Sequence, residues 1–170
     1  PAEEDLGRGA ALQPAIGDAK RGLKRRATPD VGRQSEVQTS LGSPLAIVAP
    51  AFPATGRTTR GGRMFLGGRP LEESEVWRSE AMSGVADVPT MLRNHGGLRT
   101  ALVALETIRT DAGTLEAALA KHASSGVEAV VCDAETNDDL RAIAATAARL
   151  RRPVVLAGSA GLARHVPKAF

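Results

Sequence analysis

The sequence predicts an α/β domain of three layers, in which a mainly parallel sheet carries helices on both faces. Three observations support this fold class. Short apolar runs of strand length alternate with helix-like segments between residues 44 and 170. Short connections join them, as in sheets built from strand–helix–strand units. The 170 residues include three Phe, one Trp and no Tyr, so the core has to be built from Ala, Val, Leu and Ile, which suits helices packed on a parallel sheet.

The predicted elements follow one another without long gaps. In chain order they are a strand at 45–49, a loop at 50–63, a small β-hairpin with strands at 63–66 and 69–71, a helix at 88–95, a strand at 100–105, a helix from 110 or 111 to about 122, a strand at 127–132, a helix at 137–151, a strand at 153–157 and a last helix that opens at 158–161.

Turn and cap residues define the elements of the first half. Pro44 and Pro50 bound the first apolar run, as expected of a short buried strand. Gly67 and Gly68 form a two-residue turn of the kind that joins hairpin strands. Asp87 is a candidate N-cap for the helix that follows it.

Periodicity and charge define the elements of the second half. One helical stripe with the spacing i, i+3, i+4, i+7 is formed by Leu115, Ala118, Leu119 and His122. Asn137 is a candidate N-cap of the next helix, whose first turn is acidic and whose last turn is basic, in agreement with the helix dipole.

Residues 1–43 differ from residues 44–170. They are rich in Gly, Arg, Gln and Ser and show no sustained period of 2 or 3.6, so we predict an irregular segment. Between Lys20 and Arg33, six basic residues face Asp30 alone. Such a cluster can hold phosphates, but a solvated basic tail is the simpler interpretation. No aromatic side chain lies nearby to stack on bases, and we do not expect nucleic acid as a partner.

The predicted topology brings three segments together. Right-handed crossovers place the carboxyl ends of parallel strands at one edge of the sheet. We therefore expect residues 50–63, 133–136 and 158–161 to meet there, and this edge is the default ligand site of such a fold.

The loop after the first strand is suited to an anionic ligand. Arg57, Thr58 and Thr59 follow Gly56 directly. An arginine fork matches a carboxylate with two hydrogen bonds, and hydroxyls with a glycine-exposed N–H can complete the shell. The alternative is that the arginines of this loop are solvated.

The other two strand ends offer weaker candidates. Asp133 follows an apolar strand, where its carboxylate can meet a ligand hydroxyl, orient a base or cap the loop. Gly158 and Ser159 stand at a helix start, and such termini attract anions. Tight strand–helix packing explains these two residues equally well.

Several kinds of site find no support. The only cysteine, Cys132, lies in an apolar run, and we expect its thiol to be buried and unreactive. A single cysteine excludes a disulfide within the chain. The three histidines are scattered, so we expect no metal site and assign no catalytic residue. No apolar run reaches the about 18 residues of a membrane helix, and the acidic N-terminus lacks a signal-peptide pattern, so we expect no membrane partner and a cytoplasmic location.

The segment PLAIVAPAFPATGRTTRGGRMFLGGRPL closely resembles the substrate-binding half of the four-carbon acid sugar kinases. PLEESEVW, VEAVVCDAETNDDLRAIA and RRPVVLAGSAGLA extend the resemblance to residue 163. It implies a small-molecule sugar acid, of the threonate or erythronate type or a keto form, as ligand. The implied substrate-binding residues are Phe52, Pro53, Gly56, Arg57, Thr58, Thr59, Asp133, Gly158 and Ser159.

The resemblance covers only the first domain of such kinases. In that family ATP and Mg²⁺ belong to a C-terminal nucleotide-binding domain, which is expected to be missing here, so we expect no cofactor in this chain and no activity of the chain alone. The usual Asp-Asp-Leu-Thr-Gly start is absent. The resulting hypothesis is a sugar-acid-binding kinase domain. Its rival is a non-enzymatic binding protein whose basic tail holds nucleic acid or an acidic partner.

Overall fold

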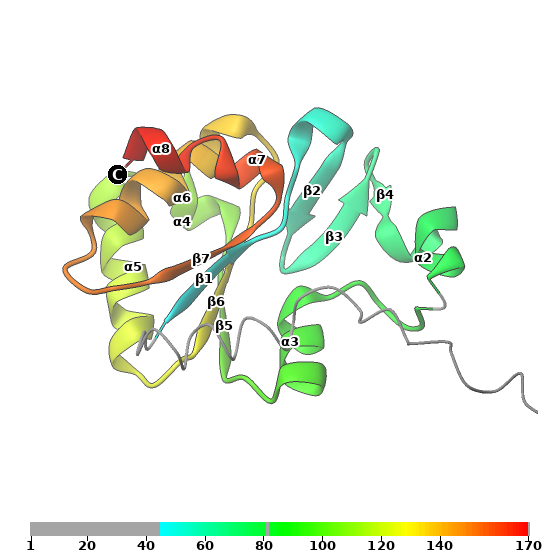
Figure 1. The fold of residues 1–170 in the computed structure, drawn as a ribbon, viewed down its shortest axis with the longest axis horizontal. Coiled ribbons are helices and arrows are strands. Elements are labelled where there is room, and N and C mark those ends of the chain that lie inside the picture. The colour runs from blue at the N-terminus through cyan, green and yellow to red at the C-terminus, as the bar shows by residue number, and fades with distance from the viewer. Residues whose placement is uncertain (1–44, 81, 170) are drawn as a thin grey trace, which may run out of the picture.

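The computed structural model describes residues 45–80 and 82–169. The segment 1–43 and the predicted boundary after residue 43 lie outside this description. Figure 1 shows the arrangement of the elements. In chain order they are β1 (Ala46–Ala49), η1 (Pro53–Thr55), β2 (Arg57–Arg60), β3 (Arg63–Leu66), β4 (Arg69–Pro70), η2 (Leu71–Glu73), α2 (Glu75–Ser79), α3 (Val88–Gly96), β5 (Thr100–Val103), α4 (Leu105–Ile108), α5 (Ala112–Ser124), β6 (Ala129–Cys132), α6 (Asn137–Arg149), β7 (Val155–Gly158), α7 (Ala160–Ala163) and α8 (Val166–Ala169).

The main sheet consists of four parallel strands in the order β5-β6-β1-β7. The central strand β1 pairs with both neighbours, so that Val48 stands opposite Val131 on one side and Ala157 on the other. Every residue of β1 and of β6 is buried, as expected where both faces of a parallel sheet are covered. The predicted mainly parallel sheet is confirmed.

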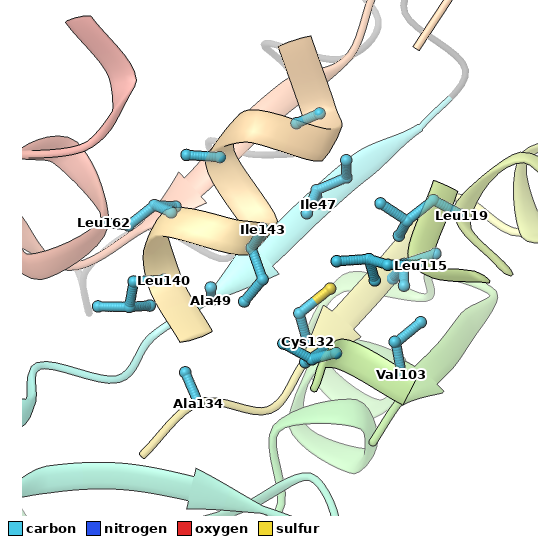
Figure 2. Packing of buried hydrophobic residues seen from close by; sticks show 14 of the residues in the cluster. Ile47, Ala49, Val103, Leu115, Leu119, Cys132, Ala134, Leu140, Ile143 and Leu162 are labelled. Carbon is cyan, nitrogen blue, oxygen red and sulfur yellow. The ribbon is translucent and has the colours of Figure 1, made fainter. Parts of the chain in front are cut away.

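The described helices cover the two faces of this sheet unequally. α4 to α8 lie on one face and α3 on the other (Figure 1). The larger core forms where Ile47 and Cys132 of the strands meet Leu119 of α5 and Ile143 of α6 (Figure 2). On the opposite face, Val48 packs with Leu92 of α3. The predicted three layers are therefore present, and their side chains are aliphatic, as the composition required.

A second, antiparallel sheet with the strand order β2-β3-β4 stands beside the carboxyl end of the main sheet (Figure 1). The predicted hairpin is its β3–β4 half, and Leu66 pairs with Arg69 across the Gly67-Gly68 turn. The expectation of a loop through residues 57–60 is wrong, because this stretch is strand β2. Its polar sequence shows no apolar alternation, and pairing with β3 makes it a strand.

Side-chain caps begin two helices where the sequence placed them. Asp87 accepts a hydrogen bond from the N–H of Thr90 at the start of α3, and Asp111 caps α5. The N-cap of α6 is Thr136 rather than Asn137. Thr136 and Asp139 form a capping box, in which each side chain accepts from the other residue's backbone, and this reciprocal pair satisfies two helix-end N–H groups.

Some element ends differ from the predicted ones. β5 stops at Val103, and the short helix α4, which was not predicted, takes up Leu105. The predicted last helix is only four residues long in α7, and α8 follows it. No helix within residues 45–80 and 82–169 is both long and apolar enough to cross a membrane.

Candidate functional site

The three predicted segments meet at the carboxyl edge of the main sheet. Thr59 of β2 donates its backbone N–H to the Ala134 carbonyl at 2.8 Å, and its hydroxyl accepts from the Ala134 N–H at 2.9 Å. The Ser159 hydroxyl donates to the Ala51 carbonyl. These contacts join the loop after β1, the loop after β6 and the start of α7, so the expected convergence is confirmed.

Asp133 holds the turn between β2 and β3. Its carboxylate accepts from the backbone N–H groups of Gly61 and Gly62 at 2.6 and 2.9 Å. The side chain is almost completely buried, and burial raises its pKa, as do the charges of Glu106 and Glu135, against the lowering effect of the two N–H groups. The sequence left open whether Asp133 meets a ligand hydroxyl, orients a base or caps the loop. In the structure its carboxylate caps the loop.

Gly62 lies in this turn, at a position where a larger residue does not fit. Its φ is +78°, and an added Cβ would lie 2.9 Å from the Pro89 ring. A glycine is therefore required both by the backbone conformation and by the close approach of α3.

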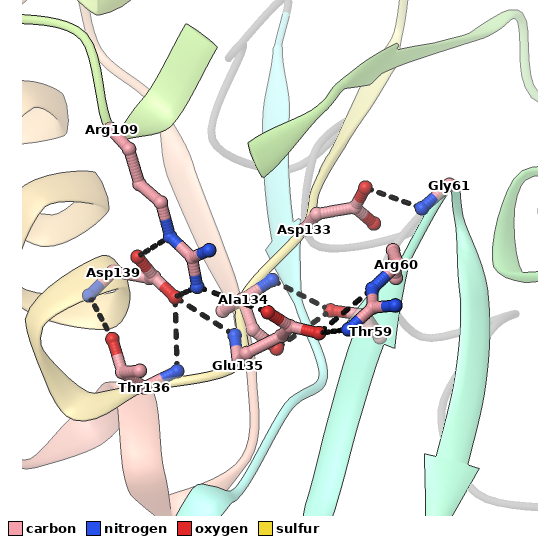
Figure 3. A network of polar contacts seen from close by, with 9 residues as sticks. All are labelled: Thr59, Arg60, Gly61, Arg109, Asp133, Ala134, Glu135, Thr136 and Asp139. Carbon is pink, nitrogen blue, oxygen red and sulfur yellow. Dashed lines mark hydrogen bonds and ion pairs between the residues drawn. The ribbon is translucent and has the colours of Figure 1, made fainter. Parts of the chain in front are cut away.

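An ion-pair network surrounds the Asp133 loop (Figure 3). Arg109, which follows α4, donates two hydrogen bonds of 2.9 Å to Asp139 and a third, of 3.1 Å, to Glu135. Glu135 also accepts from Arg60 of β2, at 2.8 Å from its Nε. The chain of contacts Asp139–Arg109–Glu135–Arg60 thus links α6 to the small sheet.

Asp139 is the buried end of this network, with 4% of its surface exposed. Burial alone would raise its pKa, but the Arg109 guanidinium and the N–H groups of Glu135 and Thr136 lower the pKa to about 2. The same contacts raise the pKa of Arg109, chiefly through its hydrogen bond with Asp139. Both groups therefore stay charged across the neutral range.

The three arginines of the β2–β3 region have different surroundings. Arg60 pairs with Glu135, and Arg63 pairs with Glu72. Arg57 makes no side-chain hydrogen bond or ion pair with any described residue, and its Nε is buried without a partner. A buried N–H of a guanidinium that lacks an acceptor is costly. Of these three arginines, Arg57 is therefore the one whose side chain has no acceptor among the described residues.

The loop from Phe52 to Arg57 positions this side chain. Phe52 and Arg57 exchange two backbone hydrogen bonds, of 2.8 and 3.2 Å, across an isolated antiparallel bridge. Directly opposed residues of such a bridge project to the same face. The turn between them contains Pro53 and ends at Gly56, whose φ is +75°. Phe52, Pro53, Gly56 and Arg57 thus form one compact corner beside the sheet edge.

The remaining predicted residues have structural contacts. The Thr59 side chain is fully buried and uses its hydroxyl on Ala134, whereas Thr58 is half-buried and pairs with Phe65 of β3. Ser159 caps α7 by accepting from the Gly161 N–H at 2.9 Å. Gly158 lies against β1, so closely that an added Cβ would stand 2.3 Å from the Ala49 carbonyl oxygen.

Comparison with known proteins identifies the family. Residues 30–166 match the family model described as a sugar-binding N-terminal domain. The chain belongs to this family.

The relatives of this sugar-binding N-terminal domain are longer proteins. The chain is 55% identical over 120 residues to a D-threonate kinase of Cupriavidus necator, covering 71% of this chain and 29% of that protein. It is 30% identical over 147 residues to a 3-oxo-tetronate kinase of Burkholderia multivorans, covering 83% of this chain and 33% of that protein. The chain thus spans about three tenths of the length of these relatives.

A solved structure shares the fold. It comes from Bordetella bronchiseptica and is described as a domain of unknown function with bound citrate, in a domain-swapped dimer. The TM-score is 0.58 and the identity 26%, and the match covers 78% of this chain and 31% of that chain.

The sequence alone did not reveal the ion-pair network of this sugar-binding domain. Arg109 lies in a stretch without a motif, and its partners Glu135 and Asp139 become neighbours only through the β6–α6 turn. The sequence did contain one signal, the run of acidic residues after an apolar strand. Acidic residues at a helix start are explained by helix capping alone, so this run did not point to Arg109 as a partner.

The described part of the domain offers no clear metal centre. No group of three His, Cys, Asp or Glu side chains gathers there in an arrangement for a cation, and the Asp133 carboxylate is occupied by two N–H groups. Burial raises the pKa of the Cys132 thiol to about 12, so it remains protonated and non-nucleophilic.

Replacing Arg109 with glutamine should lower the free energy of unfolding near neutral pH by about 1–3 kcal/mol, because the buried Asp139 carboxylate loses its charged partner. The folded-state pKa of Asp139 is lowered to about 2. The stabilisation is therefore present above the unfolded value of about 4 and disappears as the pH falls toward 2. Urea unfolding at several pH values should show the gap between the two proteins closing in acid.

The control is Arg141→Gln, which removes an exposed arginine that pairs with Asp138 on the surface of α6. This change should alter the stability by less than about 0.5 kcal/mol. A gap for Arg109→Gln that stays constant from neutral to strongly acidic pH would contradict the assigned role of Asp139.

Proposed function

We propose that this chain is the sugar-acid-binding domain of an ATP-dependent kinase that acts on four-carbon sugar acids, of the threonate or erythronate type or their keto forms. The observation that carries the proposal is Arg57, whose buried Nε has no partner at the ligand-binding edge of an α/β sheet. The names of the relatives, a D-threonate kinase and a 3-oxo-tetronate kinase, support this ligand class.

The chemistry of the site agrees with an acid as ligand. A carboxylate can accept two parallel hydrogen bonds from one guanidinium, which fixes its orientation as well as its charge. Arg60 and Arg63 are neutralised by Glu135 and Glu72, so the unpaired positive charge of this region is concentrated on Arg57. The citrate bound in the Bordetella bronchiseptica structure supports a small carboxylic acid as the ligand.

The other predicted residues support Arg57 in this proposal. The Asp133 carboxylate fixes the β2–β3 turn, and Thr59 fixes the middle of β2 on Ala134. Both contacts reduce the freedom of the strand on which Arg57 stands, and such preorganisation lowers the entropy lost when a ligand binds.

Calorimetric titration of the 170-residue chain with D-threonate, D-erythronate and 3-oxo-tetronate tests the proposal directly. We expect saturable binding of at least one of these acids, with glycerol and neutral four-carbon sugars as non-binding controls because they lack the carboxylate. A folded sample that binds none of the acids would overturn the assignment of the ligand class.

ATP and Mg²⁺ are proposed for the longer kinase. Phosphoryl transfer needs a cradle for the ATP phosphates and a held metal ion, and the sequence contains no P-loop. We expect no sugar-acid-dependent ATP consumption when the purified chain is mixed with Mg-ATP and these acids. Turnover in that mixture would show that the phosphate site lies within the 170 residues. The cytoplasmic location remains a prediction from the sequence.

A further inference from the structure

A second guanidinium group lies at the corner formed by Phe52, Pro53, Gly56 and Arg57. Arg164 follows α7 and lies over the ring of Phe52, with its Cζ 5.8 Å from the ring centroid. This is the geometry of a cation–π contact. Phe52 therefore contacts two arginines from different parts of the chain, Arg57 through the backbone bridge and Arg164 through its ring.

The fold holds this arrangement in place. The Phe52 ring lies against Gly161, since an added Cβ there would be 3.0 Å from the ring carbon Cδ2. The Ser159 hydroxyl binds the carbonyl of Ala51, the residue before Phe52. The start of α7 is thus fastened to the Phe52 corner at two points, and Arg164 leaves the helix directly above it.

Neither guanidinium is neutralised within the described chain. Arg164 is exposed and forms no ion pair with a described carboxylate, in contrast to Arg60, Arg63 and Arg109. A single anion within reach of both guanidinium groups would be attracted by both charges.

We propose that Arg57 and Arg164 form one anion site around Phe52, in which Arg164 is a second contact for the carboxylate of a small organic acid. The inference rests on the proposed function for the identity of the natural ligand, but the site itself requires only an anion. Phe52 is its positioning residue, because its ring sets the place of the Arg164 guanidinium.

The test is titration of the full chain and its variants with D-threonate, citrate and inorganic phosphate. Arg164→Gln should weaken the binding of D-threonate about tenfold, the scale of one charged and partly exposed hydrogen bond. Arg164→Lys should recover part of the loss, since it keeps the charge without the fork. The control Arg99→Gln removes an exposed arginine that precedes β5, at the opposite edge of the sheet, and should leave the affinity unchanged.

The role of Phe52 is tested by a double-mutant cycle. Phe52→Leu keeps an apolar side chain but removes the ring, so Arg164→Gln should have a clearly smaller effect in the Phe52→Leu background than in the wild type. Equal effects in both backgrounds would overturn the positioning role. Should Phe52→Leu fail to fold, the Arg164 series still tests the site, because Arg164 is exposed.

The outcomes separate the two proposals. If the wild type binds D-threonate and Arg164→Gln binds it equally well, the site inference fails and the proposed function stands. If the wild type binds citrate or phosphate in an Arg164-dependent way but no four-carbon acid, the site stands and the proposed ligand class fails. Binding of none of the probes by the folded chain contradicts both.

Discussion

Alanine in place of Arg57 should weaken D-threonate binding by about 1.5–3 kcal/mol, a factor of roughly 10 to 150 in Kd. The side chain would lose a paired hydrogen bond to the ligand carboxylate. In the free protein its Nε is buried without an acceptor. The free energy of unfolding of the variant should therefore be equal to or higher than that of the wild type. Calorimetric titration and urea unfolding of the same samples give both values.

This combination distinguishes a binding residue from a structural one. Replacing an arginine that has a structural role would lower the free energy of unfolding, whereas replacing Arg57 should weaken only the binding of D-threonate. Arg69→Ala is the matched control, because Arg69 is an exposed arginine of the same small sheet and should affect neither quantity. Arg57→Lys should bind with intermediate affinity, since lysine supplies the charge but not the planar fork. Unchanged affinity with reduced stability would contradict the assigned role.

Alanine in place of Gly158 should lower the free energy of unfolding by about 3 kcal/mol, the upper range for overpacking. The new Cβ would stand 2.3 Å from the Ala49 carbonyl oxygen, and a backbone atom cannot move aside as a flexible side chain can. β7 would have to shift from β1, which would displace Ser159 from the Ala51 carbonyl. Binding of D-threonate should therefore weaken as well.

Urea unfolding is the measurement, with Gly113→Ala as the control. Gly113 lies in the first turn of α5, and its added Cβ would meet only the Asp111 carboxylate, at 3.1 Å. Because alanine is also the better helix former, this change should stay within about 1 kcal/mol of the wild type. A similarly small effect of Gly158→Ala would show that β7 can move away from β1 at little cost.

Local signals in the sequence were sufficient for much of the fold. Asp87 and Asp111 act as caps within three residues of the groups they satisfy, and Gly67-Gly68 makes its turn with its two neighbours. Such features depend on the nearby chain alone and can therefore be predicted from it.

Features that depend on distant partners were missed. β2 is a strand because β3 and Ala134 pair with it, and nothing in Arg57–Arg60 itself requires that. Thr136 caps α6 in place of Asn137 because it forms the capping box with Asp139, although both residue types suit the position. Arg57 differs from Arg60 and Arg63 because Glu135 and Glu72 lie where they pair with those two arginines. Nothing in the sequence of the loop indicates this difference.

The small sheet is attached to the main sheet largely by polar contacts. Asp133, Thr59 and Glu135 make them, while Met64 of β3 is an apolar link, because it packs both on the cluster of Leu71, Trp77 and Ala86 and on the core beside α3. A part of a protein that has few buried apolar contacts with the rest opens at a lower free energy than the central strands. The small sheet is therefore the part expected to open first, and a ligand held by Arg57 on one side and Arg164 on the other would slow hydrogen exchange throughout it.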